Sequence, residues 1–260
     1  MAAPRLHHAL PERLERSLPA PVRGLSFGIP ALDVLLPGGL PRGRITALDA
    51  PLGSGGTALL LALAETTLRA DEGVAFVDAA RTLAPQAAAH LADLGRFWVI
   101  RPRGTENAWW CADVLLRTGA FGLVVVDQAP APHRNIAVRL QRLASDKDSA
   151  LVVRGREIHG AATSRPPLAA LVLTVAPSAD GFVPAVPGAG FAWPGPRTVR
   201  VEIAKGGAPR AAEVKVGIRL PDRLRPHWAV RDRCAGRSAG SAGGRTQRRR
   251  AAQPDWPAPR

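Results

Sequence analysis

A glycine-rich stretch between a strand-like run and a helix-like run has the residue types of a phosphate-binding loop. It reads DAPLGSGGTALLL over residues 49–61. In the pattern GxxxxGK[ST], glycines let backbone N–H groups surround a phosphate, the lysine reaches the β- and γ-phosphates, and the hydroxyl holds magnesium. With Thr57 at the hydroxyl position, the candidate nucleotide-binding residues of the loop are Gly53, Ser54, Gly55, Gly56 and Thr57.

The lysine position of this loop is held by Gly56, and Ala50 stands at its first glycine. Glycine contributes no charge to offset a triphosphate or the transition state of γ-phosphoryl transfer. The loop therefore predicts a degenerate nucleotide site with no catalytic residue. We expect no cofactor, because this loop lacks the lysine with which such loops hold ATP and magnesium. We expect a lysine at position 56 to restore part of any nucleotide binding.

A second candidate residue, Asp127, ends LVVVD (residues 123–127), the most strand-like run in the chain. Two strand–helix units separate it from Thr57, which is the spacing of a second, magnesium-supporting carboxylate at a strand end. Aspartate is common at strand ends, so the spacing alone leaves both a magnesium-binding and a purely structural interpretation open.

Short apolar runs and longer helical runs alternate from Arg44 onward, which predicts an α/β fold with a mostly parallel sheet flanked by helices. Two β runs around Gly206 and Gly207 predict an antiparallel edge hairpin near residues 198–218. Outside this hairpin, the strand-like runs are residues 44–49, 74–79, 97–100, 123–127, 150–153 and 168–175. The helix-like runs include 57–70, about 106–117, and the run within 133–149.

The last of these runs carries candidate contact residues for a partner or DNA. Ile136, Leu140 and Leu143 recur at helical spacing, with Arg139 and Arg142 on the opposite side. Arg134 precedes them. A solvated charged face would show the same pattern, so both interpretations stand.

The two ends of the chain differ in composition from the middle. Residues 1–23 form an N-terminal extension whose LPERLERSL predicts a short helix, and residues 24–220 form the core. Residues 221–260 form a basic tail with almost no aliphatic content, which we expect to be largely disordered. Arg248, Arg249 and Arg250 of this tail are further candidates for contact with a partner or DNA.

Composition narrows the function classes. The formal net charge of +14 favours a polyanionic partner such as nucleic acid, although an arginine-rich, GC-rich coding composition produces the same charge. The two cysteines form no CxxC pair, which indicates a reducing compartment. We find neither a signal-peptide core nor a membrane-length apolar run, and the six histidines have no metal-ligand spacing. We therefore expect a cytoplasmic protein with no membrane contact and no metal site.

Several phrases, taken in order, resemble the RecA ATPase core. LSFGIPALDVLLPGGLPRGRITALDAPLGSGGTALLLALA (residues 25–64) resembles its opening, and FVDAARTLAP, LVVVD, RLQRLASDKDSALVV and RVEIAKGGAP continue the series. The likeness covers roughly residues 24–220, and the phrase Gly38 to Gly43 makes it specific. It implies a RecA-like P-loop core.

This sequence departs from the RecA pattern at catalytic positions. The resemblance places the water-activating glutamate at Ala80, and it places a γ-phosphate-sensing polar residue at the strand end that reads Val153-Arg154. Together with Gly56, these changes predict a pseudo-ATPase. A shortened core of this kind is similar to the ImuA family, RecA-like accessory proteins of bacterial translesion mutagenesis.

The ImuA resemblance implies an adaptor that acts by assembly in SOS-induced translesion synthesis. Its implied partners are an ImuB-like Y-family polymerase relative, an error-prone replicative-type polymerase through it, and RecA or DNA. One alternative is an active RecA- or KaiC-like ATPase with a displaced cation, supplied by Lys205 or by a neighbouring subunit's arginine. The other is a cell-division inhibitor resembling SulA.

Overall fold

The computed structural model describes residues 24–92, 94–155, 166–184 and 194–217, without the side chains of 179–197. The N-terminal extension, most of the loop after Arg154, and the tail with Arg248, Arg249 and Arg250 lie outside the described residues. The expected domain boundaries near residues 23 and 220 stay a prediction. No helix in the described ranges is long and apolar enough to cross a membrane.

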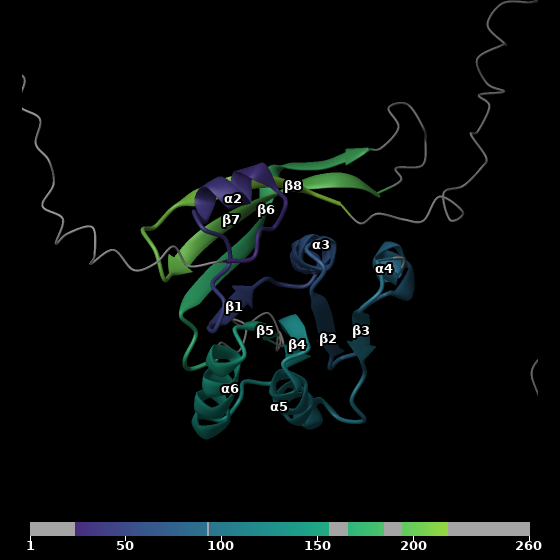
Figure 1. Ribbon diagram of the computed structural model, residues 1–260. Helices are drawn as coiled ribbons and strands as arrows, with labels where there is room; N and C mark the ends of the chain where they lie inside the picture. Colours follow the sequence, from purple (N-terminus) through teal and green to yellow (C-terminus); the bar gives the residue numbers. More distant parts are fainter. Residues whose placement is uncertain (1–23, 93, 156–165, 185–193, 218–260) are drawn as a thin grey trace, which may run out of the picture. The chain divides into compact units, whose positions relative to one another are not determined.

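The described strands form one eight-stranded sheet, in the spatial order β3-β2-β4-β5-β1-β6-β7-β8 (Figure 1). Neighbours from β3 to β6 run parallel, whereas β7 and β8 are antiparallel, so the predicted mostly parallel sheet with an edge hairpin is confirmed. The strands are β1 (Ile45–Asp49), β2 (Gly73–Asp78), β3 (Phe97–Ile100), β4 (Phe121–Ala129), β5 (Ala150–Gly155), β6 (Leu171–Pro184), β7 (Pro194–Lys205) and β8 (Ala211–Val216).

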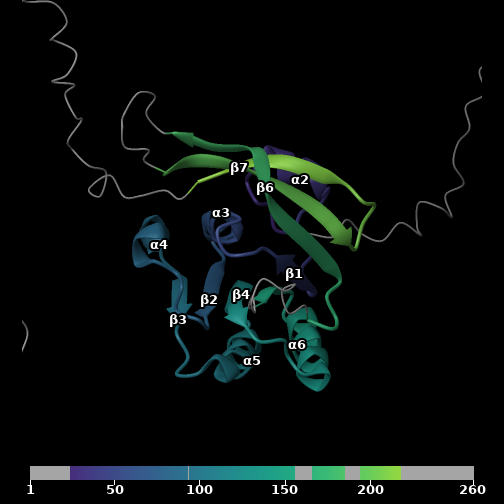
Figure 2. The same ribbon diagram turned by 180° about the vertical axis from the view of Figure 1, so that it is seen from behind.

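Helices cover both faces of the sheet, as the views from the two sides show (Figures 1 and 2). On one face, α3 and α4 pack with β2 and the hairpin in a single apolar cluster. On the other face, α5 and α6 pack against the middle strands. The helices are α2 (Pro30–Leu35), α3 (Gly56–Arg69), α4 (Pro85–Ala92), α5 (Ala108–Thr118) and α6 (Arg134–Asp146), with a short 3-10 turn, η1 (Thr105–Asn107), before α5.

The buried face of α6 differs from the one that the sequence indicated. Ala137, Leu140 and Ala144 are buried, while Ile136 is exposed. The apolar residues at 136 and 143 suggested a stripe one position away, because small alanines do not stand out in an apolar pattern. The observed stripe is at the i, i+3, i+7 spacing of a helix seated closely on a sheet.

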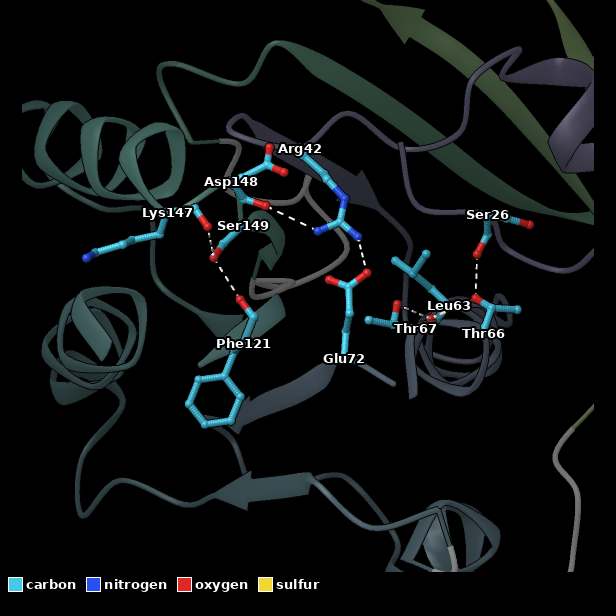
Figure 3. A network of polar contacts seen from close by, with 10 residues as sticks. All are labelled: Ser26, Arg42, Leu63, Thr66, Thr67, Glu72, Phe121, Lys147, Asp148 and Ser149. Atoms are coloured by element: carbon cyan, nitrogen blue, oxygen red, sulfur yellow. Dashed lines mark hydrogen bonds and ion pairs between the residues drawn. The ribbon is translucent and has the colours of Figure 1, made fainter. Parts of the chain in front are cut away.

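A polar network joins the turns at the amino ends of the parallel strands (Figure 3). Arg42 donates to the Asp148 carbonyl at 3.2 Å and forms an ion pair with Glu72. Ser149, next in the chain, donates to the Phe121 carbonyl at 2.7 Å. The segment containing the Gly38 to Gly43 phrase is thereby fixed to the starts of β2, β4 and β5, at the end of the sheet away from the glycine-rich loop.

Candidate functional site

The glycine-rich loop lies where the sequence predicts it, between β1 and α3. Gly53 and Gly55 have φ of 79° and 98°, a left-handed conformation that glycine adopts without strain. The Ser54 N–H donates to the Pro51 carbonyl at 3.0 Å, which closes the turn. Thr57 is half-buried in the first turn of α3, whose N-cap residue Gly55 makes no side-chain cap. The backbone shape of a phosphate loop is thus retained.

The antiparallel hairpin lies directly against this loop. A Cβ added at Gly55 would stand 2.9 Å from Val216 Cγ2 and 3.1 Å from Val199 Cγ1. Both valines are buried. The loop therefore has one wall made by β7 and β8, and Gly55 is required by close packing as well as by its positive φ.

Position 56 has no room for a side chain. A Cβ added at Gly56 would lie 2.6 Å from the Ala50 Cβ, and 2.9 Å and 3.4 Å from Nη1 and Cδ of Arg154. Ala50 is fully buried at the end of β1, so its methyl group cannot swing aside as a long side chain could. The space in which a loop lysine would begin is therefore occupied by a methyl group and by an arginine from β5.

Arg154 and Asp127 form a buried ion pair beside the loop. The strands β4 and β5 place the two residues in register. Arg154 Nε donates to Asp127 Oδ1 at 2.5 Å and Nη2 donates to Oδ2 at 2.8 Å, and the side chains are 3% and 1% exposed. Two parallel hydrogen bonds between buried side chains make this the bidentate geometry that is strongest between arginine and carboxylate.

Burial raises the pKa of the Asp127 carboxyl above its ordinary value, because desolvation disfavours the charged form. The positive charge and hydrogen bonds of Arg154 oppose this rise, while the nearby charge of Asp78 adds to it. Arg154 therefore favours the ionised form of Asp127 against the effect of burial.

A second arginine engages the neighbouring strand end. Asp78 is fully buried at the end of β2 and accepts from the backbone N–H groups of Thr82 and Leu83 at 2.8 Å and 3.2 Å. Arg101 Nε lies 3.0 Å from its Oδ2. Ala80, half-buried two residues farther on, has no carboxyl group to orient a water molecule. The Asp78 carboxylate, two residues before Ala80, already accepts from the turn and from Arg101.

The structure separates Lys205 from the loop. Its ammonium group donates to the Ala169 carbonyl at 2.7 Å, and in the ladder it is paired with Val172 near the start of β6. That is the amino end of the parallel strands, whereas the loop follows the carboxyl end of β1. Lys205 does not supply a cation to the loop of its own chain.

The candidate arginines of α6 differ in their surroundings. Arg134 and Arg142 are exposed. Arg139 is paired with Asp113 of α5, with Nε to Oδ1 at 2.6 Å and Nη2 to Oδ2 at 3.0 Å. The structure does not bring these arginines together with the glycine-rich loop into one cluster of contacts.

Among the predicted site residues, the structure brings together the loop glycines, Ser54, Thr57 and Asp127. Sequence reasoning missed Arg154 as a partner of Asp127. Its only signal was an arginine directly after an apolar strand, where the neighbouring strand ends in an acid. Across the described ranges we find no group of three or more histidine, cysteine or acidic side chains arranged to hold a metal ion.

Comparison with known proteins gives a consistent family signal. A family model for the RecA N-terminal domain matches residues 13–154. Protein RecA of Clavibacter michiganensis subsp. michiganensis is 42% identical over 114 residues, which are 43% of this chain and 32% of the relative. Protein RecA of Streptomyces venezuelae is 39% identical over 113 residues, 43% of this chain and 30% of the relative. The chain thus matches about a third of the length of these curated relatives.

Among solved structures, the crystal structure of the RadB recombinase is similar over 75% of this chain and 97% of that chain. The TM-score is 0.57 and the sequence identity is 20%. At this identity the likeness shows the fold alone, which is the fold described above.

Proposed function

The chain belongs to the family of the RecA N-terminal domain, and from this premise we propose that it is a non-catalytic RecA-fold adaptor in DNA damage tolerance. It assembles with an ImuB-like relative of the Y-family polymerases in SOS-induced translesion synthesis, and through that partner with an error-prone replicative-type polymerase. RecA and DNA are further candidate contacts. The role is assembly, with no ATP hydrolysis.

The observation that carries the proposal is the ion pair between Arg154 and Asp127. Asp127 is the strand-end acid that would support magnesium, and both of its oxygens accept hydrogen bonds from arginine. Magnesium binds oxygen ligands and is normally held by one or two carboxylates together with phosphates. A guanidinium group already on the carboxylate competes with the metal directly, so the residues present do not fit a magnesium-bound nucleotide.

Two further parts of a hydrolysis site are missing from the same place. Position 56 carries no lysine and is filled by its neighbours, and position 80 carries no carboxylate. Charge stabilisation and orientation of the attacking water are separate contributions to phosphoryl transfer. Losing both supports an inactive core more strongly than losing either one.

Exposed aromatic side chains support a docking role. Trp110 on α5 is 67% exposed and Trp98 on β3 is 59% exposed. Trp98 lies on the face of the sheet that α5 covers, since its register partner Ala75 packs in the same apolar cluster as α5. Tryptophan is enriched among the residues that dominate binding energy at protein interfaces. These two side chains are therefore the first candidates for contact with the partner.

Two measurements test the function. Phosphate release from magnesium-ATP, with and without single-stranded DNA, is expected to equal the protein-free background; turnover above background would contradict the non-catalytic role. Binding to the ImuB-like protein is then compared for the parent, Trp110→Ser and Val34→Ser. Val34 is a matched control because it is 77% exposed on α2, which packs against β8. We expect a loss of more than tenfold for Trp110→Ser only. No binding by the parent would contradict the adaptor role.

A further inference from the structure

Three residues from three different elements meet beside the loop: Ala50 after β1, Gly56 at the start of α3, and Arg154 near the end of β5. Each alone is unremarkable in sequence. Together they fill one small volume, because the Ala50 methyl group and the Arg154 side chain both lie within contact distance of the missing Gly56 Cβ.

Ala50 and Gly56 are complementary in size. The 2.6 Å between the Ala50 Cβ and a Cβ at position 56 is far below van der Waals contact, so the two positions cannot both carry a side chain in this backbone. A lysine introduced at position 56 alone would meet the Ala50 methyl group before its charge reached the loop. The expectation that lysine alone restores binding is therefore revised: glycine is needed at position 50 as well.

Arg154 places a positive charge beside Asp127, next to a loop that has no lysine at position 56. Its Cδ and Nη1 run past position 56, while Nε and Nη2 hold Asp127. The pair neutralises the buried acid internally, without lysine, metal or nucleotide. Because the pair connects β4 to the residues flanking the loop, it also gives the loop a fixed neighbour.

We propose that Arg154 is an internal replacement for the loop lysine and its magnesium ion, with Ala50 and Gly56 as the size-matched changes that admit it. This inference rests on the proposed non-catalytic function and specifies how the site came to be closed. Arg154 is a positioning residue: it holds Asp127 and occupies the volume in which a lysine would reach phosphate.

The remaining features of the loop suit an anion. Substitutions at Ala50, Gly56 and Arg154 should therefore be able to reverse the closure. Gly53 and Gly55 have a left-handed conformation, and a Cβ at Gly53 would find no heavy atom of the described residues within 4 Å. The Ser54 Oγ is buried and has no hydrogen-bond partner among the described residues. Removing the three closing residues should therefore expose a usable phosphate loop.

The packing half of the inference is tested without a ligand. Thermal unfolding is measured for Gly56→Ala in the parent and in an Ala50→Gly background. We expect Gly56→Ala to lower Tm clearly in the parent and much less in the Ala50→Gly background, because the two methyl groups then no longer meet. Equal losses in both backgrounds would overturn the size-matching of positions 50 and 56.

The charge half is tested with a swap that conserves net charge. The variant Ala50→Gly/Gly56→Lys/Arg154→Gln moves the cation from β5 to α3. We expect it to unfold at a higher temperature than Arg154→Gln alone, and to bind magnesium-ATP in calorimetry at least tenfold more tightly than Gly56→Lys alone. A folded triple variant that binds no better than Gly56→Lys, or that is no more stable than Arg154→Gln, would overturn the inference.

The same titrations separate this inference from the proposed function. Magnesium-ATP binding and hydrolysis by the parent protein would contradict the non-catalytic function itself. A silent parent with a triple variant that also stays silent would leave the function intact and refute the closure by Ala50, Gly56 and Arg154.

Discussion

The guanidinium group of Arg154 meets the carboxylate of Asp127 in a bidentate ion pair between adjacent parallel strands, with both side chains removed from solvent. Transfer of either charge alone from water into such an environment costs free energy. The attraction and hydrogen bonds between the two groups offset that cost only while both are present. The relationship therefore governs both the stability of this part of the core and the chemistry open to Asp127.

Removing the arginine should destabilise the fold strongly. Arg154→Met leaves Asp127 buried without its partner, which typically costs about 3–5 kcal/mol. Urea unfolding followed by circular dichroism measures the difference. The matched control is Arg139→Met, which removes an arginine from a pair with Asp113 whose arginine side chain is 56% exposed. An exposed pair contributes at most about 1 kcal/mol.

A second variant separates the ion pair from the shape of the arginine. Arg154→Met/Asp127→Leu replaces both charges by apolar groups, and such replacements of buried pairs are often neutral. We expect the double variant to recover most of the stability lost by Arg154→Met. A double variant as unstable as the single one would mean that lost packing, and not the unpaired acid, causes the defect.

The defect of Arg154→Met should depend on pH. Burial raises the pKa of Asp127, and loss of Arg154 removes the largest influence that opposes this rise. The folded-state pKa then lies farther above the unfolded value of about 3.9 than it does in the parent. Between these two values the folded state binds more protons than the unfolded state, so the free energy of unfolding increases as pH falls. Relative to the parent, we expect the deficit to be largest above the folded-state pKa of the variant and to shrink as the pH falls through it. A deficit that does not change with pH would contradict an unpaired buried charge at Asp127 as its cause.

The turn between β7 and β8 provides a test of the hairpin. Gly206 has φ of 94°, and a Cβ there would lie 2.3 Å from the Ala170 carbonyl oxygen. Gly206→Ala should lose more than about 1 kcal/mol in chemical unfolding. The neighbouring Gly207→Ala is the control, because its Cβ would meet only side-chain atoms of Ile203 at 3.6 Å and 3.7 Å. A similar loss at both positions would contradict the turn geometry.

Contact between α6 and DNA would be electrostatic and salt-dependent. Arg134 and Arg142 are exposed, whereas Arg139 is engaged by Asp113. If α6 contacts phosphates, Arg134→Ala/Arg142→Ala should reduce the slope of log affinity against log salt by about 1.4 on single-stranded DNA, which is about 0.7 for each lost contact. Fluorescence anisotropy with single-stranded DNA measures the slopes. Arg139→Ala should change the slope less than the double variant, and an unchanged slope in the double variant would remove α6 from the DNA contact.

The succession of strands and helices along the chain was predicted well, because buried parallel strands such as LVVVD are apolar on both faces and the edge hairpin has a glycine turn. It was less accurate for α6, where buried alanines carry little pattern. The loop was placed correctly and its missing lysine recognised, since both are local features.

What the sequence could not provide is the relationship among Ala50, Gly56 and Arg154. These residues are separated by up to about a hundred positions, and only the sheet order, with β5 between β4 and β1, brings the arginine to the loop. An arginine at the end of an apolar strand has many possible partners. The overlap of the Ala50 methyl group with a Cβ at position 56 is about an ångström, a detail of packing that no spacing rule contains.

We propose that the RecA-like core of this protein acts by assembly and not by nucleotide chemistry. Calorimetric titration of the parent protein with magnesium-ATP, followed by measurement of phosphate release on the same sample, tests it most directly. The account predicts neither saturable heat nor phosphate above background. Saturable binding followed by release of phosphate would contradict it, and would mean that Asp127 can exchange Arg154 for a metal ion.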